Sequence, residues 1–346
     1  MSGYDSGNTG SANATKSKYL LEINDLSIHF FTEEGTVKAV NDLNFNIRPG
    51  KTIGLVGETG AGKTTTALGI MSLVQSPPGL VVSGEIKFEG ENLLDLSEAE
   101  MRKVRGKKIS MIFQDPMTSL DPVFTVGDQI AESIALHNNL GKKEALKRAE
   151  EVLELVGIPG SRSGEYPHQF SGGMRQRVVI AIALSCNPSL LIADEPTTAL
   201  DVTIQAQVLE LMKELREKYQ TAMLMITHDL GIVSETCDRV AVMYAGRIVE
   251  YGTVESVFCR TKHPYTEGLF NSLPNIKVRG EDLKPIPGLM PNPADLPPGC
   301  TFAPRCAYAT ERCHTEKPAP RDLGGGHMVE CLAYDDPAFQ LVRGQA

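Results

Sequence analysis

The stretch "GETGAGKT", which begins at Gly57, has the residue types and spacing of a phosphate-binding loop. Gly57, Gly60 and Gly62 let backbone N–H groups turn toward phosphate oxygens. Lys63 brings a positive charge, and Thr64 offers a hydroxyl to Mg²⁺. A glycine-rich turn that contains a lysine by chance is the alternative, but this stretch follows a strand-like run and opens a helical one, as the motif requires. The sequence therefore predicts a site for the phosphates of a nucleoside triphosphate.

Two adjacent acids can supply the reactive half of such a site. Asp194 and Glu195 lie in "LLIADEPT", at the end of an apolar run. Asp194 is suited to Mg²⁺, and Glu195 is suited to orient and polarise a water for in-line attack on a γ-phosphate. Adjacent acids after a strand are often turn formers or helix caps, but a phosphate loop in the same chain favours the catalytic interpretation.

Two more polar side chains follow apolar runs. Gln114 ends "KISMIFQ" and can reach the metal or the attacking water, while His228 in "MITHD" can donate to the γ-phosphate. A single histidine at a strand end is more often a hydrogen-bonded structural residue. Both positions repeat the pattern of a strand followed by a polar group. We therefore predict Gln114, Glu195 and His228 as catalytic residues, and Thr64, Gln114 and Asp194 as Mg²⁺ ligands.

The stretch "FSGGMRQR" at 170–177 predicts a second anion site. Ser171 can cap a helix that runs from about Gly172 to Ala183, and the two glycines leave the amide end of this helix open. A simple helix start is the alternative. This site lies more than a hundred residues after the phosphate loop, so it is open whether both sites touch the same nucleotide.

Strand-sized apolar runs must position these groups. They are "TIGLV" (52–56), "ISMIF" (109–113), "SLLIA" (189–193) and "AMLMI" (222–226). Near-continuous apolar runs suit strands buried on both faces, as in a parallel sheet covered by helices. In such sheets ligands bind outside the carboxyl ends of the strands. The polar clusters that follow the four runs should therefore converge on one site in an α/β fold.

The rest of the chain is predicted to form an antiparallel sheet, a helical insert, an extension and two tails. "LEINDLSIHFF", "VKAVNDLNFNI" and "EIKFEG" favour an antiparallel sheet beside the main one. Helical spacing predominates from about 125 to 156 and indicates a helical insert at about 115–186. The composition becomes rich in Pro, Gly and Cys after about residue 258. We expect a disordered tail at 1–18, a nucleotide-binding domain at 19–257, an extension at 258–335 and a tail at 336–346.

Composition excludes several classes of protein. The chain has 346 residues, of which 41% are hydrophobic, and this composition is typical of a folded globular protein. Its net charge of −9 gives no positive surface of the kind that binds nucleic acid. Its longest apolar run, "VVIAIAL", is too short to cross a bilayer. The polar start of the chain has no apolar core and is not a signal peptide. We therefore expect a cytoplasmic protein.

Taken in order, these motifs resemble the ATP-binding subunit of an ABC transporter over residues 19–257. The matching parts are the phosphate loop (Walker A), Gln114, the signature "FSGGMRQR", Walker B "LLIADE", "TTALD" and His228. The resemblance implies an ABC-type P-loop ATPase fold with a mainly parallel core sheet, an antiparallel β subdomain and a helical subdomain. It also implies that two such subunits pair head to tail. Each ATP would then lie between one chain's phosphate loop and the other chain's signature.

The resemblance also implies roles for individual residues. Asp201 of "TTALD" corresponds to the D-loop aspartate, and Phe30 is the candidate for stacking on adenine, with Phe31 as a rival. Met174 replaces the Gln common after "SGG". The nucleotide-binding set is Phe30, Gly57, Glu58, Thr59, Gly60, Ala61, Gly62, Lys63, Thr64 and Thr65. The signature residues that face the partner's ATP are Ser171, Gly172, Gly173 and Met174.

Two further stretches are similar to the dipeptide/oligopeptide permease ATPases. They are "QDPMTSLDPVFTVGDQI" and "HPYTEGLFNSLP", the second followed by a Cys-rich tail. The resemblance implies ATP hydrolysis at the cytoplasmic face of the cell membrane, which powers import of peptides. The partners would be a second ATPase subunit, identical or homologous, two transmembrane permease subunits and, indirectly, an extracellular solute-binding protein. Nickel or another small solute is the alternative cargo, and a soluble ABC ATPase outside transport is a further alternative.

Four of the seven cysteines, Cys300, Cys306, Cys313 and Cys331, lie in this extension. A reducing cytoplasm makes disulfides improbable. The gaps between the four are too wide for the close pairs of most structural zinc sites, whereas four thiolates are what a [4Fe-4S] cluster requires. The resemblance also points to a [4Fe-4S] cluster, because some peptide-permease ATPases carry one here. Zinc and plain packing are the alternatives, and His314 and His327 are possible substitute ligands.

Overall fold

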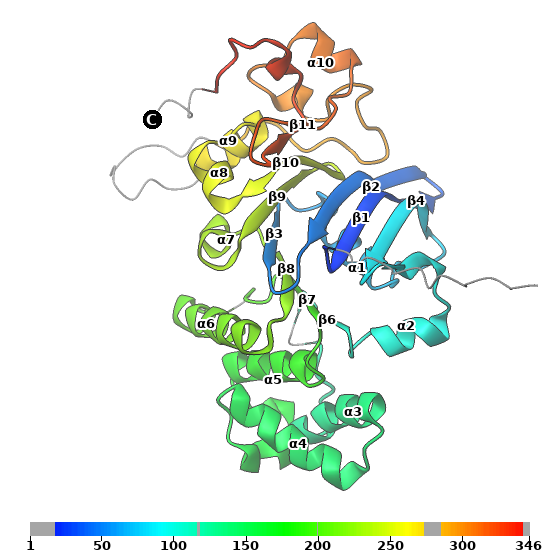
Figure 1. Cartoon of the computed structure of the whole chain (residues 1–346), viewed down its shortest axis with the longest axis vertical. Helices are drawn as coiled ribbons and strands as arrows, with labels where there is room; N and C mark the ends of the chain where they lie inside the picture. The colour runs from blue at the N-terminus through cyan, green and yellow to red at the C-terminus, as the bar shows by residue number, and fades with distance from the viewer. Residues whose placement is uncertain (1–17, 116–117, 199, 273–284, 342–346) are drawn as a thin grey trace, which may run out of the picture.

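The described residues of the computed structural model are 18–115, 118–198, 200–272 and 285–341. Two sheets lie side by side at the centre of the molecule (Figure 1). The helical subdomain lies at one end of the long axis, and the extension lies at the other (Figure 1). The predicted tails at 1–18 and 336–346 fall mostly or partly outside the described residues.

The smaller sheet is antiparallel, as predicted, with the strand order β2-β1-β4-β5. Its strands are β1 (Leu21–Thr32), β2 (Gly35–Ile47), β4 (Gly79–Phe88) and β5 (Glu91–Asn92). Leu21, Ile23 and Ile28 of β1 are buried in the core that this sheet shares with α1 (Lys63–Ile70). This sheet therefore packs directly against the helix that follows the phosphate loop.

The larger sheet has the strand order β11-β12-β10-β9-β3-β8-β7-β6. Pairing is parallel from β9 through β6 and antiparallel from β9 to β11. The strands are β3 (Thr52–Val56), β6 (Ile109–Ile112), β7 (Leu190–Asp194), β8 (Ala222–Ile226), β9 (Arg239–Tyr244), β10 (Arg247–Thr253), β11 (Arg321–Asp322) and β12 (Met328–Val329).

The four predicted parallel strands are β3, β8, β7 and β6, and they are neighbours in the sheet. Every residue of β3, β7 and β8 is buried. In β7, Leu190 and Ile192 belong to the core shared with the antiparallel sheet, whereas Leu191 and Ala193 belong to the core shared with the helical subdomain. Burial on both faces is the physical reason that these runs are apolar without alternation.

The helical insert is formed by α3 (Val126–Asn138), α4 (Lys142–Leu155) and α5 (Gly172–Leu184). The continuous helical pattern from about 125 to 156 is broken at Asn139, which caps α3 with a left-handed backbone (φ 54°). Short 3₁₀ turns at Gly160–Gly164 and Pro167–Gln169 lead into α5. Three further helices of the nucleotide-binding domain (residues 19–257, called the cassette below) lie outside the insert: α2 (Glu98–Val104), α6 (Val202–Tyr219) and α7 (Leu230–Thr236).

The extension packs onto the cassette and continues its sheet. Strand β12 pairs with β10 through Glu250 with Val329 and Tyr251 with Met328. A third core cluster contains Tyr244 of the cassette together with Tyr265 and Phe302 of the extension. The remaining short elements are α8 (Val254–Cys259), α9 (Pro264–Asn271), α10 (Glu311–Thr315) and the 3₁₀ turns Leu93–Asp95, Ala303–Arg305 and Leu332–Asp335. Across the described ranges, none of the helices is long and apolar enough to span a membrane.

Candidate functional site

The phosphate loop connects β3 to α1 and is held by contacts that only glycine tolerates. Gly57 has φ +155°, and a Cβ there would lie 2.1 Å from the carbonyl oxygen of Met243. Gly62 has φ +104°, and its Cβ would lie 2.4 Å from the carbonyl oxygen of Ala39. Both glycines are therefore required by the close approach of neighbouring backbone as well as by their own conformation.

Lys63 is turned into the loop. Its Nζ donates to the carbonyl oxygens of Gly57 (2.8 Å) and Glu58 (3.0 Å). Burial lowers the pKa of Lys63, while the carboxylates of Glu195, Asp194 and Glu58 raise it and partly offset that effect. The loop thus keeps a desolvated cation within electrostatic reach of Asp194 and Glu195, where a triphosphate would need one.

Asp194 ends β7 and is 1% exposed. Among the described residues, neither of its buried carboxylate oxygens has a well-aligned hydrogen-bond partner, although the Thr64 hydroxyl lies near enough to lower its pKa. Burial acts in the opposite direction and leaves the pKa of Asp194 above its ordinary value. A buried carboxylate without a full set of partners, beside a threonine hydroxyl, has the donor atoms that Mg²⁺ prefers.

The three predicted catalytic side chains meet at Glu195. Its carboxylate accepts hydrogen bonds from Gln114 Nε2 (3.3 Å) and Thr198 Oγ1 (3.1 Å), and lies 3.1 Å from His228 Nδ1. Glu195 adopts a left-handed backbone (φ 48°), and its N–H donates to Ile226 O of the neighbouring strand. Thr198 was not predicted as a site residue, although it lies in the "TTALD" stretch that follows Glu195 and Pro196.

The signature residues lie on a different part of the chain. Ser171 caps α5, and its hydroxyl accepts a hydrogen bond from the N–H of Met174 (3.4 Å). Figure 1 shows α5 in the helical subdomain, separated from α1. Among the described residues, no hydrogen bond or ion pair joins the signature to the phosphate loop. One chain therefore does not bring the two predicted anion sites together.

One residue links the signature helix to the loop after β7, and another caps the helix that follows this loop. Gln176 of α5 is fully buried and donates from Nε2 to Pro196 O, directly after Glu195. Asp201 caps α6, and its carboxylate accepts from the N–H of Ile204 (2.9 Å). Gln176 was not identified from the sequence because its signal is only a polar residue on an otherwise apolar helix.

The two candidate aromatic residues at the end of β1 face different surroundings. Phe30 is half-buried against the core, close enough to Gly79 that a Cβ there would lie 2.9 Å from its ring. Phe31 is 51% exposed. Phe30 thus has a packing role in this structure, and Phe31 is the more accessible ring.

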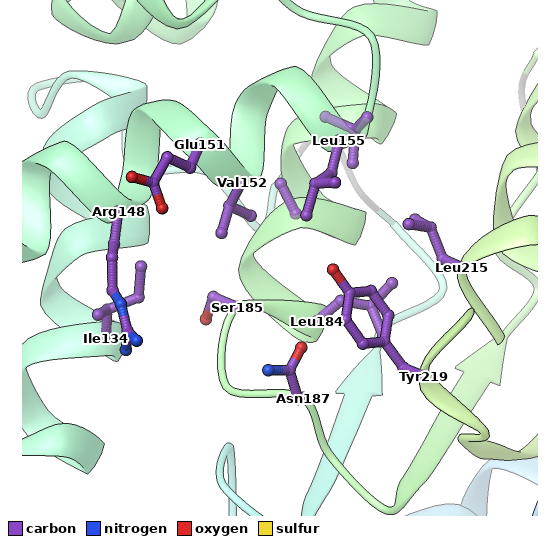
Figure 2. A pocket seen from close by; sticks show the side chains of 12 residues that line it. Ile134, Arg148, Glu151, Val152, Leu155, Leu184, Ser185, Asn187, Leu215 and Tyr219 are labelled. Atoms are coloured by element: carbon purple, nitrogen blue, oxygen red, sulfur yellow. The ribbon is translucent and has the colours of Figure 1, made fainter.

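The cavity in Figure 2 belongs to the helical subdomain. It has a volume of about 200 Å³ and lies between α4, α6 and the turn after α5, where Val152, Leu155 and the Tyr219 ring face one another (Figure 2). None of the predicted site residues lines this cavity. It is therefore not the nucleotide site.

The four cysteines of the extension are half-buried and reduced. Burial, with a smaller contribution from the neighbouring thiols of the set, raises the pKa of Cys306 to about 11 and that of Cys331 to about 12. In the part of the chain that the structure describes, no group of three or more His, Cys, Asp or Glu side chains is placed to hold a metal ion. His327 is buried with Nε2 2.7 Å from Glu250 Oε1, and His314 is exposed.

Family models and a solved structure identify the class of protein to which the chain belongs. A family model described as ABC transporter matches residues 40–198, and one described as the oligopeptide/dipeptide transporter C-terminal region matches residues 249–313. The dimeric ATP-binding cassette MJ0796, in a post-hydrolysis state bound to ADP and Pi, is 27% identical with a TM-score of 0.61. It covers 68% of this chain, and 98% of its own chain is matched. The fold and site define an ABC ATPase, and such an enzyme uses ATP and Mg²⁺.

Proteins of similar sequence identify the family within this class. The oligopeptide transport ATP-binding protein AppD of Bacillus subtilis is 53% identical over 92% of this chain and 97% of its own. The dipeptide transport ATP-binding protein DppD of the same organism is 49% identical over 93% of this chain and 97% of its own. The chain belongs to the family of ATP-binding proteins of oligopeptide and dipeptide ABC transporters.

Proposed function

We propose that this chain hydrolyses ATP at the Glu195 site as one of two ATPase subunits that drive peptide import. The observation that carries the proposal is the meeting of Gln114, Glu195 and His228 at the strand ends next to the phosphate loop. The phosphate-loop amides and Lys63 bind and orient the triphosphate. Glu195 accepts a proton from the attacking water, and His228 donates to the γ-phosphate.

The residues around Asp194 fit Mg²⁺. The buried, incompletely partnered carboxylate of Asp194 and the Thr64 hydroxyl would hold the ion, with Gln114 reaching it from the end of β6. Mg²⁺ held there would supply positive charge to offset that of the triphosphate. The chain would hold the oxygens of Asp194 and Thr64 and the side-chain amide of Gln114 in place for the ion without a large rearrangement.

The separation of the signature from the phosphate loop supports a dimer in which each ATP contacts both chains. The Ser171–Met174 stretch, with its open helix terminus, would complete the site of the partner subunit. MJ0796 is itself described as dimeric. The D-loop role of Asp201 and the adenine contact of Phe30 or Phe31 belong to the same proposal.

Replacing Glu195 with Gln tests the catalytic assignment. We expect a fall in ATPase rate of at least about 10²-fold, the usual contribution of a positioned general base, with ATP binding retained and an ATP-bound dimer trapped. Glu210→Gln, on the exposed face of α6, is the matched control and should keep the wild-type rate. Steady-state turnover retained by the Glu195 variant would remove Glu195 from the catalytic role.

The cargo and partners are inferred from the relatives. Proteins named for oligopeptide and dipeptide transport match nearly the whole chain, so we propose peptides as the solute. Two transmembrane permease subunits would recruit the chain to the cytoplasmic face of the membrane, and an extracellular binding protein would deliver the solute. Peptide-stimulated ATPase activity after co-purification with the permease subunits tests this. Stimulation by nickel and not by peptides would favour the alternative cargo.

We further propose that the four cysteines bind a [4Fe-4S] cluster. Two observations support it: the thiols are near enough to raise one another's pKa, and the Cys300 N–H donates to the Cys313 carbonyl oxygen (2.8 Å), which brings two of the four positions together. Four cysteine thiolates are the usual ligands of such a cluster. Zinc is the alternative metal, although the four cysteines lack the close pairs that most structural zinc sites use.

Metal analysis of the chain purified without oxygen tests the cluster. We expect about four irons and four acid-labile sulfides per chain, lost on replacing Cys306 with Ser. Cys259→Ser, at an exposed cysteine outside the set, is the control and should keep the iron. Stoichiometric zinc, or no metal, would contradict the cluster and leave the ATPase assignment intact.

A further inference from the structure

The "HPYT" motif of the extension reaches the phosphate loop. His263 caps α9 by accepting from the N–H of Tyr265 (3.1 Å), and this turn directs the Tyr265 side chain into the third core cluster. The Tyr265 hydroxyl accepts a hydrogen bond from the N–H of Glu58 (2.9 Å). A backbone amide of the phosphate loop is therefore paired with a side chain 207 residues further along the chain.

A second residue of the extension contacts the same position. Arg305 Nη1 lies 3.1 Å from both carboxylate oxygens of Glu58. The Arg305 side chain is 5% exposed and is also held by Pro287 O (2.9 Å) and the Tyr244 hydroxyl (3.3 Å). A guanidinium that is buried and held on several sides presents its charge in one fixed position.

Every polar group of Glu58 therefore has a partner within the chain. Its N–H donates to Tyr265, its carbonyl oxygen accepts from Lys63 Nζ, and its carboxylate pairs with Arg305. The Glu58 carboxylate is also near enough to Lys63 to raise its pKa. Without Arg305, this carboxylate would be an unpaired negative charge beside the cation that the phosphates require.

We propose that Arg305 and Tyr265 are positioning residues for the phosphate loop. Arg305 holds and neutralises the Glu58 carboxylate, so that it neither repels the triphosphate nor competes for Lys63. Tyr265 fixes the Glu58 amide on the side of the loop that faces the extension. The inference rests on the proposed role of this loop in ATP binding, and it gives the extension a direct effect on nucleotide affinity.

A charge-rescue experiment tests the proposal. Binding of a fluorescent ATP analogue to the full-length chain is titrated without Mg²⁺, and the KM for ATP and kcat are measured alongside. Arg305→Ala should weaken binding and raise KM about 10-fold, with kcat changed less than about threefold, because the unpaired Glu58 carboxylate opposes the phosphates. Adding Glu58→Gln should restore affinity to within about threefold of wild type, because the opposing charge is gone.

A matched control keeps the outcome interpretable. Arg312→Ala removes an exposed arginine of the same extension that pairs with Glu316 and Asp335, and it should leave ATP affinity unchanged. Glu58→Gln alone is measured as the reference for the double variant.

The proposal is overturned if the double variant binds as weakly as Arg305→Ala, because a purely structural role of Arg305 would not be rescued by removing the charge of Glu58. If Arg305→Ala does not fold, Tyr265→Phe decides the matter by removing only the hydroxyl. We expect it to weaken binding about two- to fivefold while lowering the Tm by only about 2–4 °C, and unchanged affinity would contradict the proposal. Failure of the wild-type chain to bind the analogue would instead contradict the proposed function.

Discussion

At the residue scale, Glu195 is kept ionised by its neighbours. Burial raises the pKa of this carboxyl, but hydrogen bonds with His228, Thr198 and Gln114 outweigh that effect and leave the pKa below its ordinary value. A carboxylate with a pKa below about 4.3 stays charged throughout the physiological range. We therefore expect any loss of ATPase activity between pH 7 and pH 5 to come from another group.

His263 makes a testable contribution to stability against pH. Burial lowers its pKa from 6.5 to about 3, so it is neutral in the folded chain and protonates on unfolding below pH 6.5. The free energy of unfolding should therefore fall as the pH drops from about 6.5 to 3, by at most about 1.4 kcal/mol per pH unit from this group.

The measurement is chemical denaturation across that pH range. His263→Asn keeps a side-chain oxygen that can cap α9 and removes the titration, so its stability should depend less steeply on pH than that of wild type. His314→Asn, at an exposed histidine of the extension, should keep the wild-type slope. Equal slopes for all three chains would show that His263 is not the group responsible.

At the element scale, Asp201 combines two roles that can be separated. As the N-cap of α6 it satisfies the N–H of Ile204, and losing such a cap costs about 1 kcal/mol. Asp201→Ala should lower the free energy of unfolding by that amount, whereas Asp201→Asn should preserve it. Denaturation and ATPase assays on both variants distinguish the roles. Wild-type hydrolysis by the Asn variant would limit Asp201 to capping.

Elements with a strong local signal were predictable, and elements formed by distant contacts were not. The apolar runs of β3, β7 and β8 follow from burial on both faces, and α5 follows from the Ser171 cap. Strands β11 and β12 have two residues each and leave no periodic pattern. Likewise, neither Arg305 nor Tyr265 lies in a stretch that signals a nucleotide site, because their role arises only when the extension packs on the cassette.

At the scale of the whole molecule, the extension is part of the cassette's core. Tyr244 is fully buried, with ring centroids 4.6 Å from Tyr265 and 5.2 Å from Phe302. Strand β12 also covers the edge of β10. The boundary near 258, drawn from a change in composition, therefore does not separate two independent cores.

A chain truncated after Phe258 should consequently be insoluble or lose at least about 10 °C in Tm, because it exposes Tyr244 and an unpaired strand edge. A chain truncated after Leu341 keeps the core and is the control, with an unchanged Tm expected. The measurements are the soluble yield and the Tm of both truncated chains. A stable, soluble short chain would mean that the cassette folds without its extension.

The ion pair between Glu58 and Arg305, residues 247 positions apart, also has a consequence for how the protein is made. The phosphate loop leaves the ribosome early, but its partner is translated only near the end of synthesis. Contacts of such long sequence separation form late, and domains are completed as the chain emerges. A nascent or prematurely terminated chain thus carries a phosphate loop that lacks Arg305. From the proposed role of Arg305, we expect full nucleotide affinity only in chains whose translation has reached the extension.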